Sequence, residues 1–209
     1  MDIMMSGIQI SAIYGYLNKT DTVLEYGSGG STTHFSKYVK HYYSIEHNKE
    51  WYEKVKNESN DISNLSYFHI PAEDFWNDEG SLSGKENLSE SEYNRLSEKY
   101  TYSEENDKYS CIGRYNQFRT YVNYVSQLGV DTFDRVLIDG RARTFCAYKV
   151  LPYLNENSLV FIDDFFRGSY DGTTRWEIEY GKQFFDLYEQ VERVDTLLVA
   201  KKNTESSYV

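Results

Sequence analysis

Acidic side chains stand at the ends of five short apolar runs of the sequence. They are Glu25, Glu46, Glu73 with Asp74, Asp139, and Asp163 with Asp164. Such runs are typical of buried parallel strands, and ligands of open parallel sheets bind at the carboxyl ends of the strands. Because carboxylates accept hydrogen bonds and attract cations, this spacing predicts a ligand with hydroxyl and ammonium donors. A ligand bound through phosphates is disfavoured.

A glycine-rich turn follows the first of these runs, with the sequence Gly27-Ser28-Gly29-Gly30-Ser31-Thr32. Glycines let the backbone approach a ligand at the start of a helix, although a purely structural turn has the same composition. The turn lacks the dinucleotide fingerprint G-x-G-x-x-G, which needs a glycine where Thr32 lies. Glu46 follows about 20 residues after the turn, at the end of the next run, where a carboxylate can accept both hydroxyls of a ribose.

The runs alternate with helical patterns, which predicts a mostly parallel sheet. The expected strands are 22–26, 41–46, 66–70, 133–138 and 158–162, followed by an antiparallel pair at 184–191 and 196–200. The expected helices are 8–17 on the sheet edge, one capped by Ser31 or Thr32 and running to about Val39, 49–57, 115–128, 144–154 and 173–180. Together these elements predict an α/β, Rossmann-like three-layer sandwich.

Composition narrows the class of protein. The 209 residues suit one domain, residues 1–209, and the formal net charge of −11 repels nucleic acid and anionic membranes. Residues 73–107 carry 11 acidic and three basic side chains, which predicts an acidic insertion or lid, or a solvated loop without a role. Two cysteines and the lack of a long apolar run favour a cytoplasmic protein with no membrane partner.

Four segments together resemble the class I S-adenosylmethionine-dependent methyltransferases. They are VLEYGSGGST, YYSIEHNKEWY, VLIDGRARTFCAYKVLPYL and LVFIDDFFR, and the similarity covers most of residues 8–201, closest to an O-methyltransferase-like branch. The resemblance implies a seven-stranded sheet that ends in a reversed hairpin. It also implies S-adenosylmethionine as the cofactor.

The resemblance assigns cofactor contacts to this chain. Glu25 and the backbone at Gly27, Ser28 and Gly29 would hold the methionine part, Glu46 the ribose, and Ala72, Glu73 or Asp74 would lie near the adenine, with His47 and Asp139 close by. The family often has a third glycine where this chain has Ser31. Ser31 is therefore expected to cap the helix and contact the cofactor carboxylate.

The chain also resembles the metal-dependent catechol and sugar O-methyltransferases, through Asp139, Asp163 and Asp164. It implies Mg²⁺ or another divalent cation held by these three carboxylates beside the acceptor oxygen. Oxygen ligands suit such a cation, which would lower the pKa of an acceptor hydroxyl. The alternative is that Asp163 caps a loop and Asp164 acts alone.

The sequence departs from both groups at the general base. Ala142 replaces the lysine of the catechol enzymes, and Arg141 replaces an acidic residue of the sugar enzymes. Because methyl transfer to a hydroxyl requires removal of its proton, Asp164 and Asp139 become the candidate bases. His47 is a weaker candidate, since it more simply packs or orients locally.

Basic and aromatic residues near these aspartates are candidates for the acceptor side. Arg141, Arg143 and Arg167 suit an acceptor with a carboxylate or phosphate, or they form salt bridges that hold the aspartates. Tyr170, with Trp176 and Tyr180, could stack on a sugar face or pack in the core.

The leading hypothesis is therefore an O-methyltransferase acting on a sugar or glycan hydroxyl, with help from a divalent metal. A catechol-like small-molecule methyltransferase and a non-catalytic cofactor-binding module remain alternatives. A nucleotide-sugar or dinucleotide enzyme is disfavoured because no phosphate cradle is present and the net charge is negative.

Overall fold

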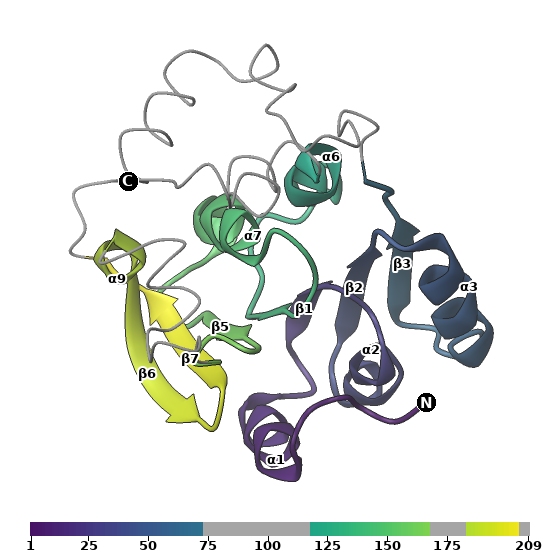
Figure 1. The fold of residues 1–209 in the computed structure, drawn as a ribbon, viewed down its shortest axis with the longest axis horizontal. Coiled ribbons are helices and arrows are strands. Elements are labelled where there is room, and N and C mark those ends of the chain that lie inside the picture. The colour runs from purple at the N-terminus through teal and green to yellow at the C-terminus, as the bar shows by residue number, and fades with distance from the viewer. Residues whose placement is uncertain (73–117, 168–182, 205–209) are drawn as a thin grey trace, which may run out of the picture.

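The computed structural model describes residues 1–72, 118–167 and 183–204. Within these ranges a single sheet has the strand order β3-β2-β1-β4-β5-β7-β6 (Figure 1). The strands are β1 (Thr22–Tyr26), β2 (His41–Glu46), β3 (Leu65–His69), β4 (Arg135–Ile138), β5 (Leu159–Ile162), β6 (Tyr188–Val194) and β7 (Leu197–Lys202). β1 to β5 run parallel, and β7 is antiparallel to both β5 and β6. The seven-stranded sheet with its reversed hairpin is confirmed.

Helices cover both faces of the sheet. They are α1 (Gly7–Tyr16), α2 (Gly30–Phe35), α3 (Lys49–Glu58), α6 (Arg119–Asn123), α7 (Arg143–Val150) and α9 (Gln183–Leu187), with 3₁₀ turns at Ser36–Tyr38, Tyr124–Gln127 and Leu151–Tyr153. Residues of α1 and α2 share one apolar cluster with the sheet, whereas residues of α6, α7 and α9 share the other. The predicted three-layer α/β sandwich is therefore confirmed (Figure 1).

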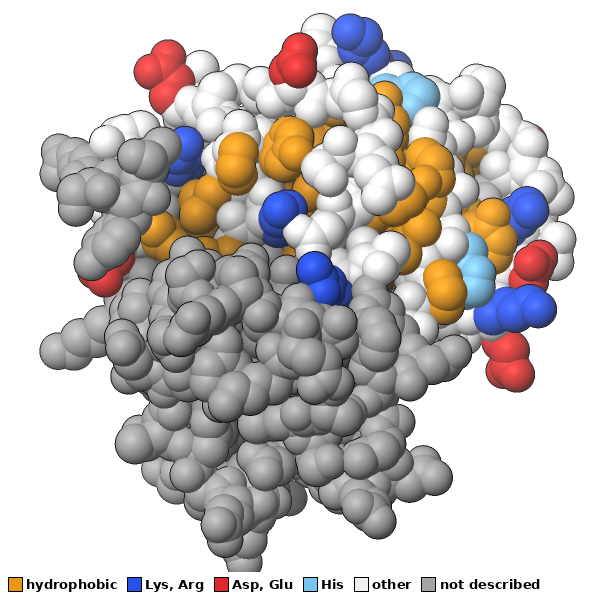
Figure 2. Space-filling view, turned by 90° about the horizontal axis from the view of Figure 1, so that it is seen from above, with side chains coloured by type: hydrophobic (Ala, Val, Ile, Leu, Met, Phe, Trp, Pro, Cys, Tyr) orange, Lys and Arg blue, Asp and Glu red, His pale blue; other side chains and the backbone are white. Residues whose placement is uncertain are grey.

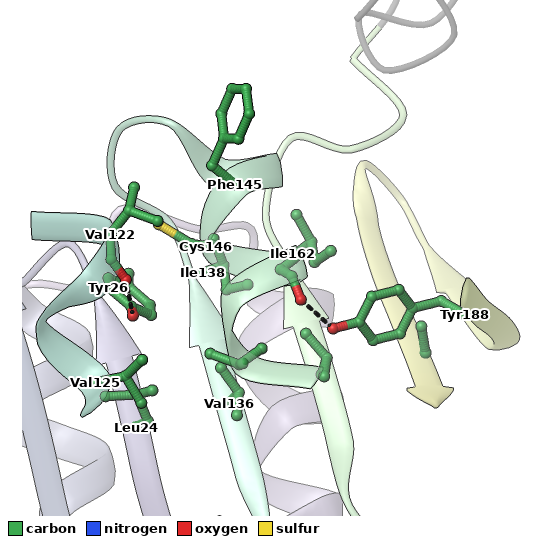
Figure 3. Close-up of a cluster of buried hydrophobic side chains, with 14 of the residues drawn as sticks. Leu24, Tyr26, Val122, Val125, Val136, Ile138, Phe145, Cys146, Ile162 and Tyr188 are labelled. Carbon is green, nitrogen blue, oxygen red and sulfur yellow. Dashed lines mark hydrogen bonds between the residues drawn. The ribbon is translucent and has the colours of Figure 1, made fainter. Parts of the chain in front are cut away.

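Successive side chains of a strand point to opposite faces of the sheet, as the two-residue repeat of a strand requires. Val23 packs with Ile13 of α1 in the smaller cluster, and Leu24 packs in the larger cluster. Figure 3 shows the larger cluster, where the Tyr26 hydroxyl donates to the Val122 carbonyl at 2.8 Å. A tyrosine whose polar end has a partner can be buried without an unsatisfied hydroxyl.

Helix α1 differs from its predicted place on the sheet edge. Ile13 is 1% exposed and belongs to a cluster with Leu137 and Phe161 of the two strands β4 and β5. Tyr16 also packs against Phe161, with ring centroids 5.8 Å apart. The helix therefore lies on a face, because its apolar residues have inner strands to cover.

Two boundaries also differ from the sequence predictions. The N-cap residue of α2 is Gly29, and both Ser31 and Thr32 lie within the first turn. The Thr32 hydroxyl contributes to the cap from there, because it accepts the Gly29 N–H. Residues Gln183–Leu187 form helix α9, and the strand predicted from Phe184 begins only at Tyr188. A short apolar run such as Phe184-Phe185 fits a strand and a helix equally well, so the pattern alone could not distinguish the two.

The strand registers bring the strand-end residues to one edge. Tyr26 is paired with Ile45 on one side and with Ile138 on the other, and Ile138 is paired with Ile162. The residues that come next along these strands are Gly27, Glu46, Asp139 and Asp163, which therefore lie at the same level. The strand order reverses between β1 and β4, which is where open α/β sheets bind ligands.

Several predictions fall outside the described residues. They concern the acidic insertion at 73–107, the helix at 173–180, and the residues Glu73, Asp74, Tyr170, Trp176 and Tyr180. Among the helices that are described, none has the length and apolar character needed to cross a membrane.

Candidate functional site

The turn after β1 touches the turn after β4 through backbone atoms. Gly27 has φ +86°, and a Cβ at this position would lie 2.5 Å from the Cα of Gly140. A Cβ on Gly140 would lie 2.1 Å from the Tyr121 hydroxyl oxygen. Both glycines are therefore required by close approach, and at Gly27 also by the left-handed backbone conformation.

Tyr121 of α6 is a site residue that the sequence analysis missed. Its side chain is fully buried against Gly140, and its hydroxyl has no hydrogen-bond partner among the described residues. Burial raises the pKa of Tyr121 well above its ordinary value, so the hydroxyl stays protonated. The residue belongs to a helical apolar stripe, which is an ordinary core pattern and carries no signal for a site.

Glu25 lies inside the protein and supports the glycine turn. Its carboxylate accepts hydrogen bonds from the hydroxyls of Ser31 at 2.5 Å, Thr32 at 2.6 Å and Ser44 at 2.6 Å. Burial raises the pKa of Glu25 to about 7, although these hydrogen bonds oppose the shift. With an exposed fraction of 0%, Glu25 offers no surface to a ligand in this conformation.

The backbone N–H groups predicted to hold the cofactor have partners within the protein. Gly27 donates to the Ile45 carbonyl at 2.9 Å, and Gly29 donates to the Thr32 hydroxyl at 3.0 Å. Ser31 directs its hydroxyl to Glu25. In this conformation internal hydrogen bonds hold the turn, and the Ser31 hydroxyl takes part in them. The contact of Ser31 with a ligand stays a prediction.

Glu46 closes the other side of the turn. Its Oε2 accepts from the Ser28 N–H at 2.8 Å and from the Ser28 hydroxyl at 3.0 Å, and its Oε1 accepts from the Asn48 N–H at 2.7 Å. Burial alone would raise the pKa of Glu46, but His47 and the two backbone N–H donors outweigh it and hold the pKa below its usual value. Glu46 is therefore a charged acceptor at the expected ribose position.

Aromatic side chains hold Ser28 in place. The Ser28 hydroxyl lies 2.6 Å from the Tyr67 hydroxyl, and the Trp51 indole N–H donates to the Ser28 carbonyl. Tyr67 in turn packs against Tyr52, with ring centroids 4.6 Å apart. The Ser28 side chain thus occupies one of the acceptor positions of Glu46 and is itself fixed by neighbours from β3 and α3.

His47 and Ala72 lie where they can border this site. The His47 Nδ1 lies 3.0 Å from Glu46 Oε1, and its ring packs edge-on against Phe118 and Tyr121. Ala72 is half-buried against the larger apolar cluster. His47 is thus held by a carboxylate and two aromatic rings, which favours the orienting role over that of a base.

The three predicted metal ligands meet around Arg143 instead. The guanidinium lies 3.0 Å from Asp139 Oδ1 and 3.8 Å from the nearest carboxylate oxygens of Asp163 and Asp164. Its Nε donates to the Gly140 carbonyl at 3.0 Å, and its terminal nitrogens donate to the carbonyls of Asp139 and Asp163. Arg143, predicted as a possible acceptor contact, is therefore engaged in salt bridges.

Two of these carboxyls have shifted pKa values. Desolvation raises the pKa of Asp139 well above its usual value, Arg143 opposes this rise, and the neighbouring Asp163 adds to it. Desolvation likewise raises the pKa of Asp163 against the effect of Arg143. The Gln9 amide also donates to Asp163 Oδ1 at 3.3 Å, which ties α1 to this cluster. No group of three metal-binding side chains arranged to hold an ion occurs within the ranges 1–72, 118–167 and 183–204.

The outer part of this cluster is accessible. Asp164 has φ +56° and its carboxylate lies 3.1 Å from the guanidinium of Arg167, whose side chain is 70% exposed. Arg141 is exposed as well. Asp164, Arg141 and Arg167 can therefore reach a ligand, whereas Asp163 is buried.

Figure 2 shows the molecule from above the view of Figure 1, the end toward which β2 and β3 run. In the described part of this face, apolar side chains cross the middle and most acidic side chains lie at the rim. Glu25, Glu46 and Asp163 are buried. These three strand-end carboxylates are thus turned inward to internal partners.

Comparison with known proteins identifies the fold. No protein-family model and no curated protein matches the sequence. A methyltransferase-like protein from Silicibacter pomeroyi is similar in structure, with a TM-score of 0.62, 18% identity, and 97% of this chain and 88% of that chain covered. A proposed caffeoyl-CoA O-methyltransferase from Staphylococcus aureus has a TM-score of 0.56 and 12% identity, with 97% and 86% covered.

A proposed methyltransferase from Streptococcus mutans, solved in complex with SAH, has a TM-score of 0.51 and 12% identity, with 96% of this chain and 100% of that chain covered. At such low sequence identities, these structural similarities show a shared fold only. The chain has the Rossmann-like fold that these solved structures share.

Proposed function

We propose that the chain is an S-adenosylmethionine-dependent O-methyltransferase that acts on a hydroxyl group of a sugar or glycan. The observation that carries the cofactor in this proposal is Glu46, an ionised carboxylate at the end of β2 that faces the glycine turn beside the switch point. A carboxylate in this place can accept the two hydroxyls of a ribose. The methyltransferase descriptions of the solved structures with this fold, one of them holding SAH, support the cofactor.

The residues of the turn fit such a cofactor. When bound, S-adenosylmethionine would supply a sulfonium methyl group for transfer to an acceptor oxygen, leaving S-adenosylhomocysteine. Glu46 would accept the ribose hydroxyls, one of them in place of the Ser28 hydroxyl that now donates to Oε2. Gly27 and Gly140 leave no side chain between the two turns, and Glu25 keeps the turn in shape from inside. A contact of Ala72, Glu73 or Asp74 with adenine stays a prediction.

On the acceptor side we assign the base to Asp164. Removal of the acceptor proton needs a carboxylate that the acceptor can reach, and the Asp164 side chain is 25% exposed at the end of β5. Asp139, whose side chain is 28% exposed, is the second candidate, because the arginine that contacts it, Arg143, is itself mostly buried. The arginine closest to Asp164 is Arg167, which is 70% exposed and can move away. Arg167 and Arg141 are exposed and can bind a carboxylate or phosphate group of the acceptor.

A divalent metal does not fit the cluster as it stands. The Arg143 guanidinium lies among the three carboxylates that would have to hold the ion. We therefore assign the proton transfer to the side chains alone.

Calorimetric titration with S-adenosylmethionine and S-adenosylhomocysteine tests the cofactor. We expect the wild-type protein to bind both, and Glu46→Ala to weaken binding by about a hundredfold, since it removes a charged acceptor of two hydrogen bonds. Glu50→Ala, which removes an exposed carboxylate from the first turn of α3, is the matched control and should bind normally. If the wild-type protein binds neither compound, the proposed cofactor is wrong and only the fold assignment stands.

A methyl-transfer assay with sugars, glycans and catechols tests the acceptor. We expect turnover of hydroxylated sugars, lost in Asp164→Asn while cofactor binding is kept. Turnover of catechols alone would select the small-molecule alternative. Tight cofactor binding with no transfer to any acceptor, and no effect of Asp164→Asn, would select the non-catalytic module.

A further inference from the structure

Arg143 lies in a pocket of backbone carbonyl and carboxylate oxygen atoms. Three backbone carbonyls, those of Asp139, Gly140 and Asp163, accept hydrogen bonds from its guanidinium. Carboxylate oxygens of Asp139, Asp163 and Asp164 lie within 3.8 Å of it. Oxygens of carbonyls and carboxylates are the ligand type that Mg²⁺, Mn²⁺ or Ca²⁺ prefers. In this conformation they are arranged around the guanidinium, and the side chains of the described residues are not placed to hold an ion.

The position of Arg143 in the chain is otherwise unfavourable for a cation. It is the first residue of α7, where the helix dipole disfavours positive charge by about 0.3–1 kcal/mol. The preceding residue, Ala142, adopts φ +48°, a left-handed conformation that costs a non-glycine residue about 1 kcal/mol or more. Both costs are offset only if the guanidinium has strong partners, and the three aspartates provide them.

We propose that the Arg143 guanidinium takes the place of a divalent cation between Asp139, Asp163 and Asp164. The cluster then binds no divalent ion while Arg143 is present, and it becomes a divalent cation site when that side chain is neutralised. Removal of the guanidinium leaves Asp139 and Asp163 without a counterion and leaves Asp164 with only the exposed Arg167. An added cation relieves the repulsion among the three carboxylates. This inference stands on the cluster alone and does not depend on methyl transfer.

Titration with Mn²⁺, followed by the electron paramagnetic resonance signal of the free ion, tests the proposal. Arg143→Gln removes the charge but keeps a side chain of similar polarity, and Arg143→Lys keeps the charge. We expect Arg143→Gln to bind one Mn²⁺ at least about tenfold more tightly than the wild-type protein or Arg143→Lys. The double variant Arg143→Gln with Asp139→Asn should lose that gain.

Circular dichroism of each variant with and without Mn²⁺ completes the test. If Arg143→Gln folds only when Mn²⁺ is added, the ion has replaced the guanidinium and the proposal is supported. The proposal is overturned if the wild-type protein binds one Mn²⁺ that Asp139→Asn abolishes. It is also overturned if Arg143→Gln binds Mn²⁺ no better than the wild-type protein, or stays unfolded with Mn²⁺ while Arg143→Lys folds.

Discussion

The two sides of the switch point hold their carboxylates in different ways. On the β1–β2 side, Glu46 accepts from backbone N–H groups and a serine hydroxyl beside His47, and Glu25 accepts from three hydroxyls. On the β4–β5 side, Asp139, Asp163 and Asp164 surround the Arg143 guanidinium. Both sides are built from the same feature, an acidic residue at a strand end.

The difference indicates which side can exchange its partners. A serine hydroxyl on a carboxylate can be replaced by a ligand hydroxyl with little change in charge or hydrogen-bond number. Withdrawing a guanidinium from three carboxylates leaves uncompensated charge and costs far more. The β1–β2 side is therefore suited to bind and release a ligand, whereas the inner β4–β5 side is a fixed support.

The largest effect we expect concerns the contact that joins the two sides. Gly27→Ala combines a left-handed backbone with a Cβ 2.5 Å from Gly140, so the free energy of unfolding should fall by about 4 kcal/mol. Gly29→Ala is the matched control, since its backbone is extended and its Cβ would lie 3.9 Å from the nearest atoms. Urea unfolding of both variants measures the difference. Equal stability of the two would show that the turns can separate freely.

The second prediction separates Glu25 from Glu46 by pH. The pKa of Glu25 is about 7 in the folded protein and near 4.5 when unfolded, so the folded state binds more protons between these values. Stability is therefore lost as the pH rises from about 4.5 to about 7, by about 3 kcal/mol at most. Glu25→Gln should abolish this loss. It should also lessen the pH dependence that Asp139 contributes, because the charge of Glu25 is one of the causes that raise the pKa of Asp139.

Urea unfolding at pH 5 and pH 8 measures this effect. The wild-type protein should lose stability relative to Glu25→Gln over this interval. Glu46 has a lowered pKa, so its contribution is present above about pH 4.5 and is lost only in more acidic solution. The free energy of unfolding of Glu46→Gln should therefore change between pH 5 and pH 8 by the same amount as that of the wild-type protein. Parallel curves for Glu25→Gln would show that Glu25 is ionised throughout.

The sequence could predict the strand-end positions because parallel strands bring consecutive motifs to one edge. Glu46 was predicted from its distance to the glycine turn, and the structure places it against Ser28 of that turn. Asp139, Asp163 and Asp164 were predicted to meet, and they do lie together. These predictions depend on chain order and strand register, both of which the hydrophobic pattern encodes.

The roles of the arginines and of Tyr121 could not be predicted in the same way. Arg143 follows Ala142, whose backbone is left-handed, and its side chain contacts the aspartates, while Arg141 is exposed. Nothing in the residue types distinguishes the two. Tyr121 lies in an apolar helical stripe, and its contact with Gly140 arises only from the packing of α6 beside the β4 turn. Such facts depend on side-chain direction, which spacing does not determine.

The smallest effect we expect tests whether the β1–β2 side exchanges its partners. Ser28→Ala removes the hydroxyl that donates to Glu46 Oε2 at 3.0 Å but keeps the backbone donor at 2.8 Å. Under the proposed function, a competitor for the ribose hydroxyls is lost, so calorimetry should show cofactor affinity unchanged or up to about fivefold tighter. Ser44→Ala is the control, since it removes a hydroxyl from Glu25 and should lower stability without changing affinity. An affinity loss of about tenfold or more in Ser28→Ala would instead make Ser28 a direct cofactor ligand, and the exchange at Glu46 would be wrong.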